Sequence, residues 1–289
     1  MCFRVRIGRR TCQENKTMYD LCLGLLLSCI VVLGGDFVSP ATAGDPSARD
    51  IMEKNFFVMK ISTIRNSAVM TLLTEGGGVR ERKMDIIGKL QINGIDSKLI
   101  IRFQYPPDIK GTGFLQIEAS EGDDNIWVYL PALHKSRRLV ANNKKDSFFG
   151  SDFSYGDILP PKVDLFRHTL IRSEKVEGNE CYVIESVPKD EKEKTNCGYS
   201  RKVSWLHKEN FLENKIVYYD TEGQLLKTQI ISGHVNVDKK NLKWIAGRRE
   251  MTNHQTRHKT ILVQDQIQVG KPIAEGFFTI SSLEREGLK

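Results

Sequence analysis

Residues 99–104 read LIIRFQ, and their side chains alternate along the chain. Leu99, Ile101 and Phe103 are spaced two residues apart. In an extended strand they would share one face, because successive side chains of a strand point to opposite faces. The residues between them become more polar towards the end of the stretch. This pattern predicts a half-buried β-strand.

The same period of two recurs in most of the chain after Ser67. Turn sequences such as Asn93-Gly94 and Glu222-Gly223 separate the segments, and few of the connections are long enough for a helix. The pattern therefore predicts eleven to thirteen strands in one antiparallel, meandering sheet. The further strand segments are residues 79–92, 115–117, 125–130, 167–176, 180–187, 199–206, 213–220, 224–237, 243–252 and 258–269.

A sheet of this size must curl, split or close, because large twisted sheets do not stay flat and open. We therefore expect a mainly β protein with a few helices. Its sheet would be a curved antiparallel half-barrel, an incomplete β-barrel of about 11 strands, with an apolar concave face. Helices or loops would have to cover that face.

Three segments are candidates for the cover: an opening helix, the connection 141–166 and the C-terminal segment 277–283. Residues 47–50, SARD, form a capping-box pattern that marks the start of the helix. Met52, Phe56 and Met59 would form its apolar face.

The N-terminal region has the order of a secretory signal peptide. Residues 1–20 carry several basic side chains, residues 21–33 are almost entirely apolar, and Ala41 and Ala43 follow. We therefore expect residues 1–43 to be removed on export. Residues 44–289 would then form a single domain in the periplasm.

Two alternatives for this region remain open. Residues 26–29, LLSC, resemble a lipoprotein box, in which Cys29 would be acylated and would anchor the chain to a membrane. The segment could also stay uncleaved as an anchor. The apolar run is shorter than the roughly 20 residues that a spanning helix needs, which disfavours the second alternative.

Loss of residues 1–43 would leave only Cys181 and Cys197 in an exported, oxidising setting. If 180–187 and 199–206 are the arms of a hairpin, the two cysteines lie on the order of 20 Å apart at about 3.3 Å per residue. Bridged Cα atoms lie within roughly 7 Å of each other. This geometry argues against a disulfide.

Composition and motifs exclude several classes of function. The 43 basic and 36 acidic residues give a net charge of +7 that is spread along the chain. A small, dispersed excess of this kind gives little support to nucleic-acid binding. No nucleophile-and-base motif, phosphate loop or metal-ligand spacing is present. His254 and His258 would lie across a turn between two strands. We expect no catalytic residue, no metal and no cofactor, and therefore no enzyme.

Residues 147–157 read SFFGSDFSYGD, which is rich in aromatic side chains without a strand or helix period. The segment could plug one end of the sheet, with its serine and aspartate oxygens holding the turns together. It could instead line the entrance of an apolar cavity and touch a ligand. Two charged runs, 134–138 and 189–194, are most simply a solvated hairpin and a solvated loop. The first could also meet anionic lipid or an acidic partner.

Several stretches in order resemble the LolA-like family of bacterial outer-membrane lipoprotein-sorting proteins, and the similarity covers residues 47–286. The resemblance rests on residues 106–108 (PPD), 110–115 (KGTGFL), 127–133 (WVYLPAL), 137–138 (RR), 150–155 (GSDFSY), 215–227, 251–253 (MTN) and 278–279 (FT). It implies a half-open barrel that shields acyl chains of lipoproteins, or other lipids. It also implies a donor or acceptor protein at the inner or outer membrane. We expect a monomer.

We expect the cavity and its mouth to be built by two sets of residues. The strand residues facing the cavity would be Leu99, Ile101, Phe103, Leu115, Ile117, Trp127, Tyr129, Tyr182, Ile184, Val203 and Trp205. The mouth or lid would be Phe148, Phe149, Asp152, Phe153 and Tyr155. The assignment depends on register, because a shift of one residue turns a strand inside out.

The leading hypothesis is a periplasmic carrier that holds acyl chains in an apolar cavity, and it predicts a roomy, ligand-accessible cavity. The second is a non-enzymatic accessory or sensor module of the cell envelope that binds a protein, with a filled core. A hydrolase is the third, and it would need converging titratable residues in a cleft.

Overall fold

The computed structural model describes residue 44 and residues 46–285. The predicted signal peptide and Cys29 lie outside the described residues, so both interpretations stay predictions.

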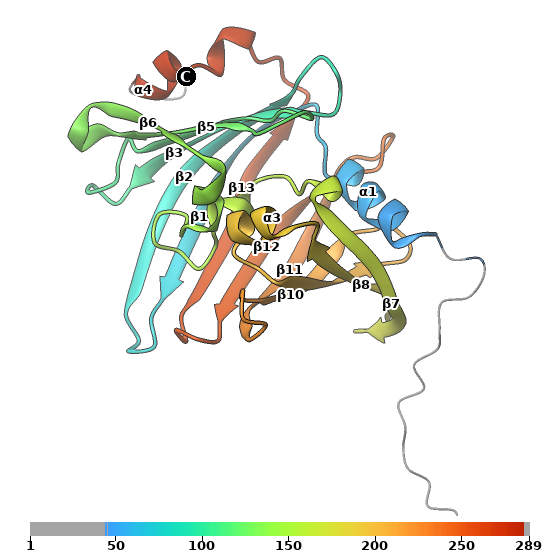
Figure 1. Ribbon diagram of the computed structural model, residues 1–289. Coiled ribbons are helices and arrows are strands. Elements are labelled where there is room, and N and C mark those ends of the chain that lie inside the picture. Colours follow the sequence, from blue (N-terminus) through green and yellow to red (C-terminus); the bar gives the residue numbers. More distant parts are fainter. Residues whose placement is uncertain (1–43, 45, 286–289) are drawn as a thin grey trace, which may run out of the picture. The chain divides into compact units, whose positions relative to one another are not determined.

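The described residues build one sheet of thirteen antiparallel strands, in the order β6-β5-β4-β3-β2-β1-β13-β12-β11-β10-β9-β8-β7. Strands β6 and β7 are its edges, so this part of the chain does not close into a barrel (Figure 1). The strands are β1 (Thr63–Leu73), β2 (Val79–Leu90), β3 (Ser97–Tyr105), β4 (Gly113–Ile117), β5 (Asn125–Leu130), β6 (Lys135–Leu139), β7 (Phe166–Val176), β8 (Asn179–Pro188), β9 (Arg201–His207), β10 (Glu213–Tyr219), β11 (Leu225–Asp238), β12 (Lys243–Asn253) and β13 (Lys259–Val269).

The mainly β fold with its curved, open antiparallel sheet confirms the expectation, but the strand count is higher than about 11. Strand β6 falls in the basic run 134–138, where the burial pattern shows no apolar alternation. Strand β1 begins before Ser67, where the sequence period was expected to start.

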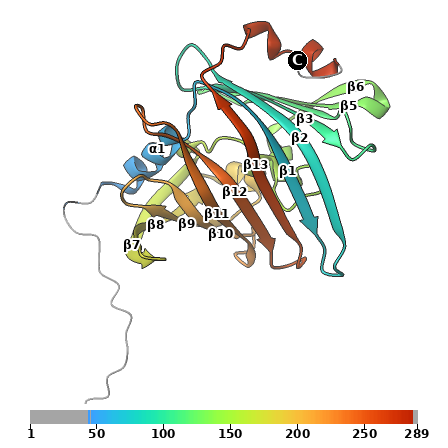
Figure 2. The ribbon, with the colours of Figure 1, turned by 180° about the vertical axis from the view of Figure 1, so that it is seen from behind.

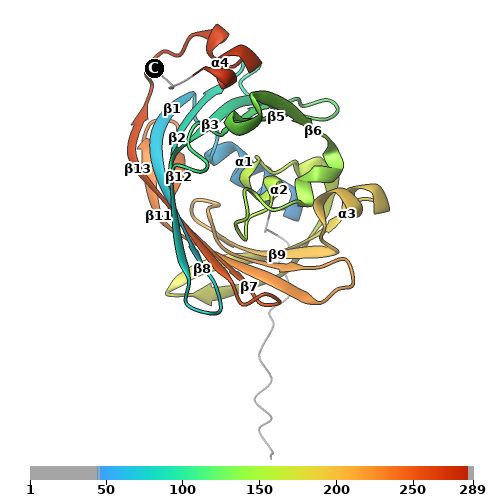
Figure 3. The same ribbon diagram turned by 90° about the vertical axis from the view of Figure 1, so that its left-hand side faces the viewer.

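The chain builds the sheet in two halves that meet in the middle. Strands β1 to β6 run out to one edge, and β7 to β13 return from the other edge until β13 pairs with β1 (Figure 2). The connection from β6 to β7, residues 140–165, therefore has to pass from one edge of the sheet to the other. It does so inside the curve of the sheet (Figure 3). Its short helices are η2 (Ala141–Lys145), α2 (Tyr155–Ile158) and η3 (Val163–Leu165).

A pair of glycines brings β11 and β12 unusually close. Gly233 has a φ of +62°, a left-handed conformation that favours glycine. A Cβ atom on Gly247 would lie 2.5 Å from the carbonyl oxygen of Gly233. Where β11 pairs with β12, glycine is therefore required at 247 by the close approach and favoured at 233 by the backbone conformation.

Helix α1 (Ala48–Val58) begins with the predicted capping box. The Ser47 hydroxyl accepts a hydrogen bond from the Asp50 backbone N–H, and the Asp50 carboxylate accepts one from the Ser47 N–H. Its buried face differs from the one expected. Ala48, Ile51, Met52 and Asn55 are buried, whereas Phe56 is half-buried and Met59 is exposed. The helix packs on the inner face of the sheet against Tyr182, Ile184 and Leu206.

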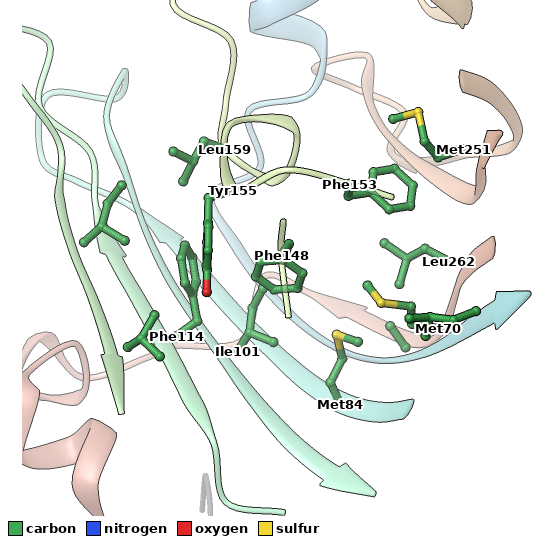
Figure 4. Close-up of a cluster of buried hydrophobic side chains, with 14 of the residues drawn as sticks. Met70, Met84, Ile101, Phe114, Phe148, Phe153, Tyr155, Leu159, Met251 and Leu262 are labelled. Atoms are coloured by element: carbon green, nitrogen blue, oxygen red, sulfur yellow. The ribbon is translucent and has the colours of Figure 1, made fainter. Parts of the chain in front are cut away.

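The aromatic segment of the connection fills the inner core near β1 to β5. Phe148 and Phe153 are fully buried, and Tyr155 is nearly so. Figure 4 shows these rings among Met70, Ile101, Phe114 and Leu262 of the sheet. The Ser151 hydroxyl donates to the Phe148 carbonyl at 2.8 Å and so closes the turn. The segment is therefore a plug of the core, as the first of the two interpretations predicted.

The C-terminal segment lies on the other face of the sheet, which corrects its expected place on the concave side. It contains η4 (Glu275–Phe277) and α4 (Ile280–Glu284). Helix α4 lies outside the curve of the sheet (Figure 3). Phe278 and Leu283 pack against Ile100 and Leu115 on the outer face of β3 and β4. Both faces of these strands are apolar, so each can bury a covering segment.

Residues 191–197 form helix α3 (Glu191–Cys197), which corrects the expected solvated loop at 189–194. The Asp190 carboxylate caps its N-terminus by accepting from the Glu193 N–H, and Gly198 ends it with a φ of +75°. The sequence pattern did not indicate this helix because its charged residues show no apolar period.

Candidate ligand cavity

A cavity of about 400 Å³ lies between helix α1, residues 156–166 of the connection and the inner face of the sheet. Its cover is mostly apolar and includes Met52, Leu159, Pro160 and Pro161. Trp244 and Ile245 of β12 contribute further apolar surface. Its size is in the range of about 300–1,000 Å³ that is usual for small-molecule sites.

The wall formed by β8 to β12 carries a group of polar side chains beside apolar ones such as Ile216, Ile231 and Ala246. The polar group consists of inward-facing side chains of neighbouring strands: Ser186, Lys202, Ser204, Glu213, His234 and Arg249. The strand register brings them to one face, because Ser186 pairs with Lys202, and Ile231 pairs with Arg249. Residues directly opposite each other on paired strands share a face. This set is called the polar wall below.

Two ionisable groups of the polar wall are shifted towards their neutral forms. Burial raises the pKa of the Glu213 carboxyl, and the Ser204 hydrogen bond and the charges of Lys202 and Arg249 only partly oppose the shift. Burial, together with the neighbouring His207, lowers the pKa of His234. His234 is therefore neutral at pH 7, and the positive charge of the wall comes from Lys202 and Arg249.

Neither cation of the polar wall has a carboxylate within 4.0 Å in the described part of the chain. Lys202 Nζ lies 4.4 Å from the centre of the Phe166 ring. Arg249 donates to the Asp157 carbonyl at 2.8 Å and lies 5.3 Å from the centre of the Phe153 ring. The Gln229 amide fits its neighbours with its oxygen 2.7 Å from Arg249 Nε. All of these partners are uncharged.

A buried ion pair ties the connection to the sheet beside the cavity. Lys227 Nζ on β11 lies 2.7 Å from an Asp157 carboxylate oxygen, and both side chains are almost fully buried. Tyr199 Oη and the Ser154 N–H also donate to this carboxylate. Burial alone would raise the pKa of Asp157, but the charge of Lys227 and these hydrogen bonds lower it overall. Asp157 is therefore ionised, and its charge is matched by Lys227.

Two further pairs neutralise cations in the cavity lining. Lys60 Nζ lies 2.6 Å from a carboxylate oxygen of Glu118, and both are buried. Lys162 Nζ lies 2.9 Å from a carboxylate oxygen of Asp124. These pairs fix the start of β1 and the end of the connection to the loops that follow β4.

Of the residues predicted to face the cavity, Leu99, Ile101, Phe103, Tyr182 and Ile184 lie on the inner face. Leu99 lines the cavity. Ile101 and Phe103 lie in the packed core around the aromatic plug. Tyr182 and Ile184 pack beneath helix α1.

The remaining predicted strand residues lie on the outer face, which corrects their assignment. Leu115, Ile117, Trp127 and Tyr129 pack in the cluster that the C-terminal segment covers. Val203 and Trp205 pack with Cys181 and Val183 on the outer face of β8 and β9. Strands β4 and β5 carry apolar side chains on both faces, so side-chain size and period could not tell the inside from the outside, whereas on β9 the apolar pair lies outside and the polar pair inside.

The residues predicted at the mouth lie elsewhere as well. Phe148, Phe149, Phe153 and Tyr155 pack into the inner core, and the lining of the cavity on this segment begins at Gly156. The Asp152 carboxylate accepts a hydrogen bond from the Thr260 hydroxyl at 2.7 Å, which ties the plug to β13.

Sequence reasoning missed the polar wall. Lys202 and Ser204 alternate with Val203 and Trp205, and the apolar pair was taken as the inner one. The signal in the sequence was the polar residues that alternate with apolar ones along several consecutive strands. It indicates a polar inner surface only when the register between the strands is known.

The described residues contain no group of three or more His, Cys, Asp and Glu side chains that could hold a metal ion. Cys181 and Cys197 are both free thiols. His254 lies on the β12–β13 hairpin and hydrogen-bonds Thr228 at 2.9 Å. No helix within residues 46–285 has the length and apolar character needed to span a bilayer.

Other proteins of known structure share this fold. A family model described as "Uncharacterized protein" matches residues 95–285. No curated protein sequence matches the chain.

Three solved structures share the architecture. A structure described as an outer membrane lipoprotein-sorting protein domain from Vibrio parahaemolyticus is 29% identical over 82% of this chain and 98% of that chain, with a TM-score of 0.75. A DUF1329 family protein from Desulfovibrio piger is also 29% identical, over 82% of this chain and 97% of its own, with a TM-score of 0.75.

A LolA superfamily protein from Nitrosomonas europaea is 17% identical over 82% of this chain and its full length, with a TM-score of 0.65, and it shows the fold alone. The family model matches residues 95–285, and each of these three structures covers 82% of the chain. The chain belongs to the family whose model is described as "Uncharacterized protein", and its fold is LolA-like.

Proposed function

We propose that this protein is a periplasmic carrier that binds a lipid, or an acyl chain of a lipoprotein, in the cavity beneath α1 and carries it towards the outer membrane. The observation that carries the proposal is the covered cavity of about 400 Å³ between α1, residues 156–166 and the inner face of the sheet. The description of the Vibrio parahaemolyticus relative as a lipoprotein-sorting domain supports it.

Carriage of an acyl chain through water needs an apolar enclosure and no covalent step. Each buried methylene is worth about 0.8 kcal/mol, so a chain leaves a membrane only when a cavity replaces that environment. Met52, Leu159 and Pro160 supply apolar cover, and α1 and the connection together enclose the ligand. Release requires this cover to move, or a membrane acceptor protein to compete for the ligand.

The expected setting of this carrier is the bacterial periplasm, with residues 1–43 as the leader and 44–289 as the single mature domain. A lipid anchor at Cys29 is the alternative form of the same proposal. Transfer would then join a donor at the inner membrane to an acceptor at the outer membrane, with the protein as a monomer.

Native mass spectrometry with lipid extraction tests the proposal. The full-length chain is expressed in bacteria, and the exported protein is purified from the periplasm without detergent. Co-purified acyl lipid or lipopeptide is the expected result. A clean apo mass, together with no binding of a fluorescent fatty acid, would contradict the carrier and favour a protein-binding envelope module.

A matched pair of variants links the bound lipid to the cavity. Ala246→Phe on β12 adds a ring inside the cavity lining, whereas Ser232→Phe adds the same ring on the exposed outer face of the neighbouring strand β11. We expect A246F to lose the co-purified lipid and S232F to keep it. Equal lipid content in the two variants would show that the lipid lies elsewhere.

A further inference from the structure

On the basis of the proposed function, we propose that the cavity selects a single-chain anionic amphiphile. Its negatively charged head group would lie against the polar wall at Lys202 and Arg249. Its acyl chain would lie beneath the apolar cover formed by α1 and residues 156–166.

The first argument is the charge of the lining. Four other lysines of the lining have a carboxylate within 4.0 Å: Lys60 pairs with Glu118, Lys162 with Asp124, and Lys89 and Lys98 with Glu275. Lys202 and Arg249 have no carboxylate within 4.0 Å among the described residues, and both face the cavity from the sheet. Cations that lose part of their hydration without a counter-ion are costly, and a bound anion offsets that cost.

The second argument is the state of the two acids near these cations. Burial raises the pKa of Glu213 on the wall and of Glu193 on α3, so both carboxyls are shifted towards their neutral form. Lys144, a third cation of the lining, lies near Glu193. The wall therefore remains positive as the acids become neutral.

The third argument is the division of the cavity into two surfaces. The polar wall lies on strands β8 to β12, and apolar side chains of β10 to β12 extend the surface beside it. Met52, Leu159 and Pro160 face both from α1 and the connection. The volume of about 400 Å³ is in the range for one small ligand. This arrangement fits a charged head group joined to one chain.

A comparison of charged and uncharged probes tests the inference on protein purified after expression of the full-length chain. Binding of cis-parinaric acid and of its methyl ester is followed by fluorescence. We expect the acid to bind at least about tenfold more tightly, as one charge-assisted hydrogen bond would give. The Lys202→Met variant should weaken binding of the acid and leave binding of the ester unchanged, since Arg249 remains.

Lys215→Met is the matched control, because Lys215 is on the adjacent strand β10 and lies over Trp205 on the outer face. It should leave both affinities unchanged. Equal binding of acid and ester, or an equal effect of K202M on both, would overturn the anionic subsite while the carrier stands. If neither probe binds the wild-type protein, both proposals fail.

Competition identifies the source of the negative charge. Oleic acid carries a carboxylate, lysophosphatidic acid a phosphate, and lysophosphatidylcholine no net charge. Displacement of parinaric acid by either anionic lipid, with weak displacement by lysophosphatidylcholine, supports the inference and names the head group. Equal displacement by all three would overturn it.

The pH dependence separates an electrostatic role from a structural one. Ser204, Lys202, Arg249 and His234 face Glu213, and ionised Glu213 would compete with the ligand for the two cations. The affinity for a short alkyl sulfate below its micellar concentration should fall as pH rises through the raised pKa of Glu213. Glu213→Gln should remove this fall. The same pH profile in both proteins would overturn the role of the polar wall.

Discussion

At the scale of single residues, Asp157 and Lys227 form the contact that fixes the connection over the cavity. Their charged atoms lie 2.7 Å apart, and the side chains are 3% and 6% exposed. A buried pair adds little net stability over apolar residues, but loss of one partner leaves the other charge unmatched.

We therefore expect Asp157→Asn to lower the free energy of unfolding by about 3–5 kcal/mol, measured by urea denaturation. Glu75→Gln is the control, because Glu75 pairs with Arg257 at the surface. Exposed pairs contribute about 0–1 kcal/mol. Equal losses in the two variants would show that the Asp157 pair is not buried in solution.

Glu213 should make stability depend on pH. Its pKa is raised in the folded protein, so the wild type loses stability relative to a neutral residue as pH rises from the ordinary glutamate value of about 4.3 through the raised value. Glu213→Gln should therefore be more stable than the wild type at neutral pH, and the difference should vanish below about pH 4.

Thermal unfolding across this pH range measures the difference. Glu209→Gln is the control, since Glu209 is exposed in the turn after β9. Its difference from the wild type should stay small and flat with pH. A flat profile for E213Q as well would contradict the burial of the Glu213 carboxyl.

At the scale of elements, the close pairing of β11 with β12 depends on Gly247. A Cβ there would lie 2.5 Å from the Gly233 carbonyl oxygen, which is backbone and cannot move aside. Gly247→Ala should therefore cost about 1–3 kcal/mol of stability, the usual range for overpacking. Gly76→Ala in the β1–β2 turn meets no atom within 4 Å and should change stability little. Chemical denaturation of the two variants gives the comparison.

The C-terminal segment should stabilise the sheet from its outer face. Leu283 is fully buried in the outer cluster with Leu115, whereas Ile280 in the same helix is 38% exposed. Leu283→Ala should cost about 2–5 kcal/mol, and Ile280→Ala much less. Differential scanning calorimetry measures both. Similar small losses would show that the segment is not docked in solution.

At the scale of the whole molecule, the proposed ligand would lie between the sheet and a cover that has to open for exchange. Binding should therefore slow amide hydrogen exchange in α1 and in residues 156–166, which enclose the cavity. Exchange in α4, on the outer face, should stay unchanged. Mass-spectrometric exchange with and without parinaric acid tests this. Protection limited to the outer face would place the ligand there.

The sequence by itself determined the antiparallel, mainly β architecture, the start of helix α1 and the family resemblance. Strand period, turn residues and the capping box at Ser47 are local signals, so they are readable without neighbours. It did not show the buried face of α1 or the helix α3. The first depends on what the helix packs against, and the second is a charged run without an apolar period.

Only the tertiary structure decided which face of each strand is inside. Leu99 and Leu115 have similar sequence surroundings, yet one lines the cavity and the other packs under the C-terminal segment. The polar wall formed by Lys202, Glu213 and Arg249 exists only because register aligns the hairpin of β9 and β10 with β12 across β11. A period of two identifies a strand, but the choice between two equally apolar faces depends on the segments that cover them.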